Sequence, residues 1–260
     1  MAIDNTIYDR EGQTWRDDRH VLSLLMHLAP PRAAYIRAVL TRKLRLDPAG
    51  RRALDVGCGG GLLAEAVADL GYRVVGLDPA RRSVAAARAH AVATGHSIAY
   101  GVAAGEALPF ADAVFDVAYC FDVLEHVGDW EQVVAETARV LKPGGVFVYD
   151  TLNRTRLSRL AMIRLPQEWR ATAIFDANFH DWRMFITPRE MRAAFTRHQL
   201  AVCETIGFQP HVNPLTVVRL FRRFRRGDAT YGDIGRYLGA RLRTGPITAI
   251  AYGGYAIKVG

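Results

Sequence analysis

The feature that most constrains this chain is a glycine-rich turn over residues 54–61 (LDVGCGGG). The apolar run 52–56 before it predicts a buried strand, and apolar residues at helical spacing over 60–70 predict a helix. Glycine adopts positive φ angles and lets the backbone approach a ligand closely, while the start of a helix adds oriented N–H groups. A strand, a glycine turn and a helix in this order predict a nucleotide-type binding loop.

The spacing inside the turn narrows the kind of ligand. The turn carries one acid followed by glycines at every second position: Asp55, Gly57, Gly59 and Gly61. A dinucleotide site would follow GxGxxG, so the spacing argues against a nicotinamide enzyme. Asp78 closes the next predicted strand and Pro79 follows it. A carboxylate there can accept two hydrogen bonds from ribose hydroxyls, so these residues predict nucleoside binding.

Strand and helix signals alternate through the middle of the chain, which predicts a parallel sheet with right-handed crossovers. The predicted strands are 52–56, 73–77, 97–102, 114–120 and 146–149, with helices over 60–70, 80–94 and 130–141. Two late strands are predicted at 200–206 and 247–259. A further helix is predicted over 188–198, because Thr187 and Glu190 have capping-box spacing around Pro188.

The ends of the chain differ from the middle and predict a cap. We expect a single structural domain with an N-terminal helical lid (1–46), a cofactor-binding core (47–150) and a C-terminal part (151–260) that completes the sheet. Cap insertions are expected at about 154–185 and 208–245.

Composition excludes several classes of protein. Half of the 260 residues are hydrophobic, which excludes a disordered chain, and three cysteines without a CxxC pair argue against a disulfide scaffold or structural zinc. No apolar run approaches the roughly 18–20 residues of a membrane span, and the first twenty residues lack a signal-peptide core. A cytoplasmic protein is the expectation.

The net charge of +8 is concentrated in two segments. Residues 219–243 carry a net +6 and residues 154–170 a net +4. They indicate either a phosphate, anionic lipid or acidic ligand nearby, or simply solvated faces. Because residues 154–170 interleave arginine with leucine and isoleucine, peripheral contact with an anionic membrane is one prediction. Phe221 and Phe224 between arginines would suit nucleic acid, but no NPPY-type tetrapeptide follows the fourth strand, so none is expected.

Several motifs together resemble a known family. Region 51–150 is similar to class I S-adenosylmethionine (SAM)-dependent methyltransferases, and most of the chain resembles the ubiquinone-biosynthesis O-methyltransferases. The resemblance rests on PRAAYI (31–36), LDVGCGGGLLAE (54–65), VGLD (75–78), VLEHV (123–127), LKPGG (141–145), TLNR (151–154), HDW (180–182), FITP (185–188) and HVNPLT (211–216). It implies a Rossmann-like, seven-stranded sheet with helices on both faces and a helical cap. It also implies SAM as cofactor and a phenolic or catechol hydroxyl of a hydrophobic small molecule, a quinol precursor, as acceptor; a secondary-metabolite O- or N-methyltransferase is the alternative.

The resemblance also implies roles for single residues. Arg32 matches an arginine that holds the cofactor's carboxylate, and Phe121 matches a position that packs near the cofactor. Where many relatives carry an acid that binds the adenine amino group, this chain has alanine. Adenine is therefore expected to rely on Gly105 and Glu106.

The transfer itself needs a way to deprotonate the acceptor, because a phenol with a pKa of about 10 is mostly neutral at pH 7. Asp122, Glu125 and His126 follow the fourth strand at i, i+3, i+4 spacing. In the family such a set is associated with a divalent cation, so it predicts Mg²⁺ ligands, or residues that order the loop. His126 and His180 are the predicted catalytic bases.

Overall fold

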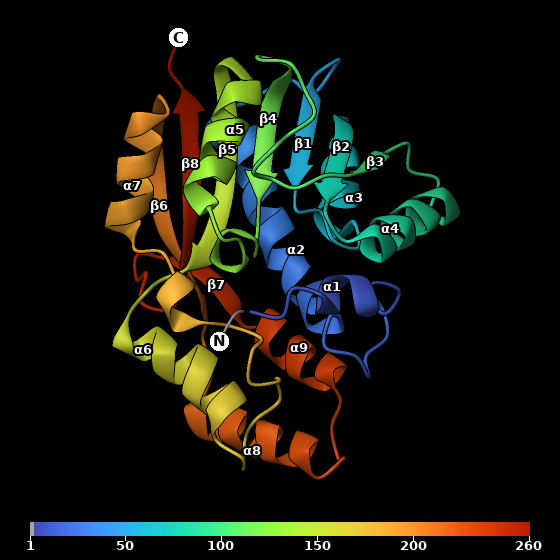
Figure 1. Cartoon of the computed structure of the whole chain (residues 1–260), viewed down its shortest axis with the longest axis vertical. Helices are drawn as coiled ribbons and strands as arrows, with labels where there is room; N and C mark the ends of the chain where they lie inside the picture. The colour runs from blue at the N-terminus through green and yellow to red at the C-terminus, as the bar shows by residue number, and fades with distance from the viewer. Residues whose placement is uncertain (1–2) are drawn as a thin grey trace.

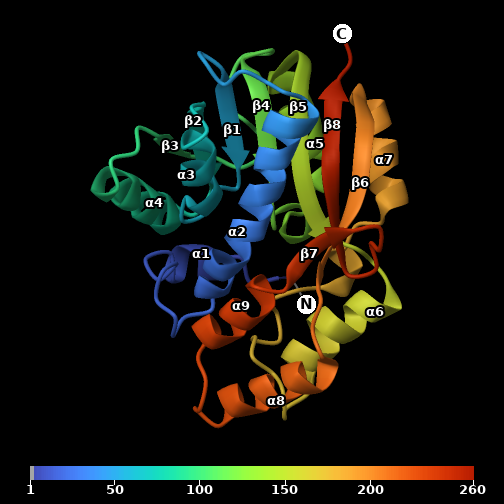
Figure 2. The same cartoon turned by 180° about the vertical axis from the view of Figure 1, so that it is seen from behind.

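The structure, a computed structural model, describes residues 3–260. Over these residues one sheet runs in the order β3-β2-β1-β4-β5-β8-β6-β7, with helices on both faces (Figures 1 and 2). Its strands are β1 (Arg52–Val56), β2 (Arg73–Asp78), β3 (Ala99–Val102), β4 (Phe115–Cys120), β5 (Leu141–Leu152), β6 (Leu200–Pro210), β7 (Leu242–Gly245) and β8 (Ala251–Lys258). The helices are α1 (Ile7–Arg10), α2 (Ser23–Arg37), η1 (Ala38–Lys43), α3 (Leu62–Ala68), α4 (Arg81–Ala93), η2 (Leu124–His126), α5 (Trp130–Val140), α6 (Arg156–Ser158), η3 (Arg159–Glu168), η4 (Trp182–Met184), α7 (Pro188–Arg197), α8 (Pro214–Arg225) and α9 (Tyr231–Gly239).

The sheet confirms the predicted α/β, Rossmann-like class, with one correction to its strand count. Strands β1 to β5 pair in parallel, and β8 lies antiparallel between β5 and β6. The predicted seven strands become eight because β6 continues to Pro210. Its last four residues, from Gly207, then pair with Leu242–Gly245 as an edge strand. Sequence analysis placed that edge strand inside the 208–245 insertion, because four residues carry too little pattern to be recognised.

Two apolar layers hold the helices against the sheet. Successive residues of a strand point to opposite faces, and β5 shows this directly. Val146 and Val148 pack with the layer of α2, η1, α3 and α4. Phe147 and Tyr149 pack with α5 and α7 on the other face. The predicted capping box of α7 is confirmed, since the Thr187 hydroxyl accepts from the Glu190 N–H and the Glu190 carboxylate accepts from the Thr187 N–H.

A cap lies at the carboxyl ends of the parallel strands, at the bottom of Figure 1. It combines α1 with α6, η3, α8 and α9, and a separate apolar cluster joins its parts. That cluster includes Ile7 and Trp15 from the N-terminal segment, Ile174 from the loop after η3, Phe221 of α8 and Ile234 of α9. None of the helices formed by residues 3–260 has the length and apolar character needed to cross a membrane.

Candidate functional site

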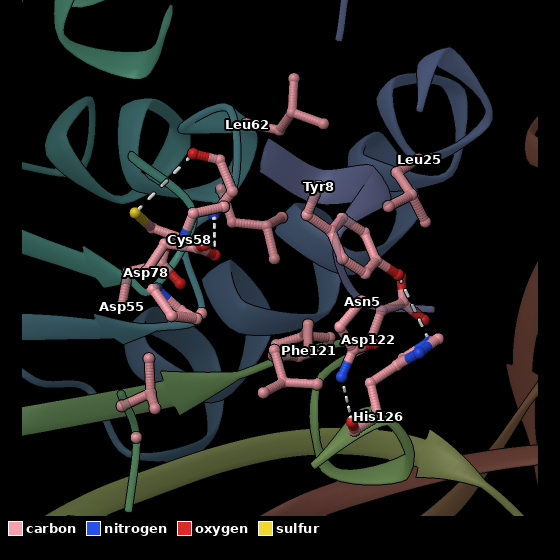
Figure 3. A pocket seen from close by; sticks show the side chains of 18 of the residues that line it. Asn5, Tyr8, Leu25, Asp55, Cys58, Leu62, Asp78, Phe121, Asp122 and His126 are labelled. Atoms are coloured by element: carbon pink, nitrogen blue, oxygen red, sulfur yellow. Dashed lines mark hydrogen bonds between the residues drawn. The ribbon is translucent and has the colours of Figure 1, made fainter. Parts of the chain in front are cut away.

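A cavity of about 380 Å³ lies between the carboxyl edge of the sheet and α1 (Figure 3). Its volume falls within the range of small-molecule sites. Nine of the ten residues predicted to bind the cofactor line it: Arg32, Asp55, Gly57, Gly59, Asp78, Pro79, Gly105, Glu106 and Phe121. Gly61, the tenth, caps α3 with a φ of +80° and does not line the cavity; a Cβ there would lie 2.5 Å from the Tyr100 hydroxyl.

The glycine turn is held against β2 by its own backbone. The N–H groups of Gly57 and Cys58 donate to the Leu77 carbonyl, at 2.8 and 2.9 Å. Gly57 has a φ of +76°, which glycine adopts without strain, and a Cβ there would lie 2.3 Å from Val123 Cγ2. The turn is therefore close-packed on one side while it lines the cavity on the other.

Two buried carboxylates lie beside the turn. Asp78 accepts from the N–H groups of Gly59 and Ala80, at 2.9 and 2.8 Å, so both of its oxygens are oriented by backbone. Oxygen Oδ2 of Asp55 is buried and has no hydrogen-bond partner among the described residues. Burial, followed by the charge of Asp78, raises the pKa of Asp55 well above its usual value. Unused acceptor capacity at the cavity wall fits a ligand that brings donors or positive charge.

The N-terminal segment supplies part of the wall, which sequence analysis missed. Asn5, Tyr8 and Trp15 line the cavity. The Trp15 indole donates to Ser83 Oγ at 2.9 Å, and its ring occupies the space that a Cβ at Gly59 or Gly60 would need. No spacing or motif marks these residues, because they are placed only by tertiary contacts.

A buried ion network surrounds Arg32. Its Nε donates to Asp150 at 2.7 Å and its Nη2 donates to Asp122 at 2.5 Å. Burial by itself would lower the pKa of Arg32, but these two carboxylates raise it above its usual value. Asp150 was missed, although an acid at the carboxyl end of the fifth parallel strand was the available signal.

We expect the unliganded protein to become less stable as pH rises from about 4 to about 7. Burial, only partly offset by Arg32, raises the pKa of Asp122 from 3.8 to about 7. Because the folded state binds this proton more tightly than the unfolded state, stability is lost as pH rises through the folded pKa. Relative to Asp122→Asn, the wild type should lose about 2 kcal/mol between about pH 5 and pH 7.5, measured by denaturant unfolding. Equal slopes in the two proteins would contradict the shift.

The predicted magnesium set is not assembled, which corrects that prediction. The Asp122 carboxylate is taken by Arg32, and the buried Glu125 carboxylate accepts from the Thr151 hydroxyl at 2.9 Å. The His126 ring instead meets Tyr8, whose hydroxyl lies 3.5 Å from Nε2. Spacing i, i+3, i+4 fails here because Asp122 has a φ of +55° and precedes a single 3₁₀ turn, so no helical face exists. Within residues 3–260 no three metal-ligating side chains come together.

The two predicted catalytic histidines do come together. The rings of His126 and His180 lie 5.1 Å apart between centroids. His126 lines the first cavity, and His180 lines a second cavity of about 670 Å³ next to η3. Burial lowers the pKa of His126 to about 4, and burial and His126 lower that of His180 well below its usual value. Both rings are therefore neutral at physiological pH.

Comparisons with known proteins agree with this geometry. Residues 54–149 match the family described as a methyltransferase domain. A ubiquinone biosynthesis O-methyltransferase of Methylobacterium sp. (strain 4-46) is 35% identical over 210 residues, covering 78% of this chain and 84% of that protein. The enzyme of the same name from Brucella ovis is 33% identical over 230 residues, covering 86% of this chain and 90% of that protein.

The chain belongs to the ubiquinone biosynthesis O-methyltransferase family. It is a SAM-dependent O-methyltransferase. Solved structures share the fold of this methyltransferase at lower identity. A SAM-dependent methyltransferase from Thermotoga maritima is 18% identical with a TM-score of 0.58, covering 97% of this chain and 98% of that one. The [4+2]-cyclase SpnF is 18% identical with a TM-score of 0.61, covering 97% of both chains.

Proposed function

We propose that SAM binds in the first cavity and that nine residues of its wall hold it, while Gly61 shapes the turn. Asp78 would accept from the ribose hydroxyls, and the backbone of Gly105 with Glu106 would border the adenine. Phe121 would pack against the cofactor. For Arg32, Nε and Nη2 are engaged by carboxylates, which leaves Nη1 to the cofactor's carboxylate.

The charge of the cavity supports a cationic ligand. Asp55, Asp78 and Asp122 line it, and Arg32 is the opposing cation among its lining residues. A sulfonium or an ammonium placed beside these acids would lower their raised pKa values and favour their charged, attracting forms. Pro79 would border the ribose beside Asp78.

We propose a phenol or catechol on a hydrophobic small molecule, of the ubiquinone-precursor kind, as acceptor. The observation that carries this is the His126–His180 pair beside the cofactor cavity. The pair is flanked by the rings of Phe175, Phe179 and Phe185, with centroids 4.8 to 6.1 Å from that of His180. Aromatic walls suit a flat ring, and a neutral imidazole can take the proton of a phenol during an in-line transfer.

The test of the acceptor is initial rates with labelled SAM on matched compounds. A prenylated catechol, its dimethoxy analogue without a free hydroxyl and the corresponding aromatic amine form a minimal set. We expect methylation of the catechol alone, with the methyl on oxygen. Methylation of the aromatic amine at a rate comparable to that of the catechol would contradict the proposal that the acceptor is a hydroxyl oxygen.

Tyr8→Phe is expected to lower kcat about tenfold while leaving the affinity for SAM nearly unchanged, because it removes only the hydroxyl beside His126 Nε2. Stopped-time assays and calorimetric SAM titration measure the two quantities. Tyr237→Phe on α9, outside both cavities, is the control and should leave kcat at the wild-type value. An unchanged kcat in Tyr8→Phe would show that its hydroxyl takes no part in the transfer.

We also propose peripheral contact with an anionic membrane through the segment 156–170. It exposes the apolar side chains of Leu157, Leu160 and Trp169 beside exposed arginines at 156, 159, 164 and 170. Apolar side chains among exposed arginines are the pattern of an interfacial segment. Flotation with vesicles containing phosphatidylglycerol, against phosphatidylcholine vesicles as control, tests this; equal flotation with both would contradict it.

A further inference from the structure

Among residues 3–260, the side chain that hydrogen-bonds to His180 is that of Gln167. The Gln167 Oε1 atom accepts from the His180 backbone N–H at 2.8 Å and lies 3.2 Å from His180 Nδ1. Its Nε2 donates to the carbonyls of His180 and Ala177, at 3.1 and 3.5 Å. The Gln167 side chain is buried, so these contacts determine its orientation.

The orientation of Gln167 determines where His180 carries its proton. The carbonyls of His180 and Ala177 need the NH₂ group of the amide as their donor. The amide oxygen therefore faces the backbone N–H and the Nδ1 atom of His180. An amide oxygen only accepts, and therefore Nδ1 of His180 must donate to it. A neutral imidazole has one N–H, so its Nε2 is left with a free lone pair.

We propose that Gln167 is a positioning residue that holds His180 as the Nδ1–H tautomer, so that Nε2 accepts the proton of the acceptor hydroxyl. The tautomer stands on the hydrogen bonds alone, whereas the role of Nε2 rests on the proposed function. In the step, the acceptor O–H bond breaks and its proton bonds to Nε2. The oxygen forms a bond to the methyl carbon, and the carbon–sulfur bond breaks with its electron pair going to sulfur.

The surroundings of His180 bear on this role in two ways. Three phenylalanine rings and the His126 ring pack around it, which keeps the ring neutral before the reaction but also opposes the imidazolium that forms during transfer. His180 also lines the second cavity, through which the imidazolium can return its proton to water after transfer. Gln167 lines the same cavity, so the positioning contact and the proton exit are adjacent.

The tautomer is tested by ¹⁵N NMR on the full chain labelled at histidine side chains. His180→Asn identifies the His180 signals by difference. We expect a protonated Nδ1 and an unprotonated Nε2 in the wild type, and the same in Gln167→Glu, which keeps an acceptor oxygen in place. Gln167→Met lacks the acceptor and should lose the Nδ1–H form. The signals of His96, which is bonded to Asp69 and Thr94 far along the chain, should stay unchanged and report an intact fold.

Kinetics separate the tautomer from the chemistry. Gln167→Met should lower kcat about 10²-fold, with the KM for SAM within about twofold of wild type. A wild-type Nε2–H signal, or an Nδ1–H form that persists in Gln167→Met, would overturn the positioning role. A tautomer change without a fall in kcat would overturn Nε2 as the proton acceptor. If the NMR result is as expected but no catechol is methylated, the proposed acceptor class is wrong and the tautomer assignment still holds.

Discussion

Replacing Arg32 by methionine is expected to lower the free energy of unfolding by about 3–5 kcal/mol and to abolish measurable SAM binding. The guanidinium is buried and is the shared partner of Asp122 and Asp150. Without it two carboxylates remain close together in the interior with no cation between them. Denaturant unfolding and calorimetric titration measure the two effects.

Two further variants show whether both effects of Arg32→Met come from losing the buried charge. Arg37→Met changes an exposed arginine at the end of the same helix and should cost little of either property. Adding Asp122→Asn and Asp150→Asn to Arg32→Met removes the stranded charges, so it should restore stability without restoring binding. If Arg32→Met were as stable as Arg37→Met, the ion network would not be a stabilising element. If it bound SAM normally, Arg32 would not hold the cofactor.

Gly57→Ala is expected to weaken SAM binding roughly 100-fold. A left-handed φ costs a residue with a Cβ about 1–2 kcal/mol, and the contact with Val123 adds a comparable amount. Together these approach about 3 kcal/mol, which corresponds to about two powers of ten in affinity. The free variant can relieve this cost by shifting the turn away from its bonds to the Leu77 carbonyl, and SAM binding must restore the strained turn, so the cost appears in the affinity.

A second glycine of the chain provides the control for Gly57→Ala. Gly50 has almost the same φ, +73°, but a Cβ there would meet nothing within 4 Å. Gly50→Ala therefore reports the backbone strain alone and should leave SAM affinity unchanged. Adding Val123→Ala to Gly57→Ala removes the steric part and should recover about tenfold in affinity. Affinity in Gly57→Ala equal to that of Gly50→Ala would mean that the turn does not border the cofactor.

The parts of the site that sequence predicted are those whose signal is local. A glycine turn, an acid at a strand end and a capping box are each specified within a few residues. The start of α7 was therefore predicted, and so was the presence of Gly57 and Asp78 at the cavity wall, while their roles toward the cofactor stay predictions. The resemblance to relatives added Arg32 and His180, which no local pattern would select.

What sequence could not predict depends on contacts between distant residues. The bond between Asn5 and the His126 carbonyl spans 121 positions, and the pairing of Arg32 with Asp122 spans 90. The magnesium prediction failed for this reason, since nothing near Asp122 shows that its carboxylate is already taken. Gln167 likewise could not be selected from the sequence, because only its short distance to His180 distinguishes it from other polar residues of the same region.

The N-terminal segment has a consequence for the timing of the catalytic cycle. Trp15 packs on the glycine turn and Tyr8 borders the same cavity, so we predict that the spent cofactor and its replacement exchange past this segment. Methyl transfer would then need this segment closed, and exchange would need it open. A single turnover would therefore run faster than the steady state, and the opening rate of this segment, which lies outside the matched methyltransferase domain (54–149), would set the throughput of the enzyme.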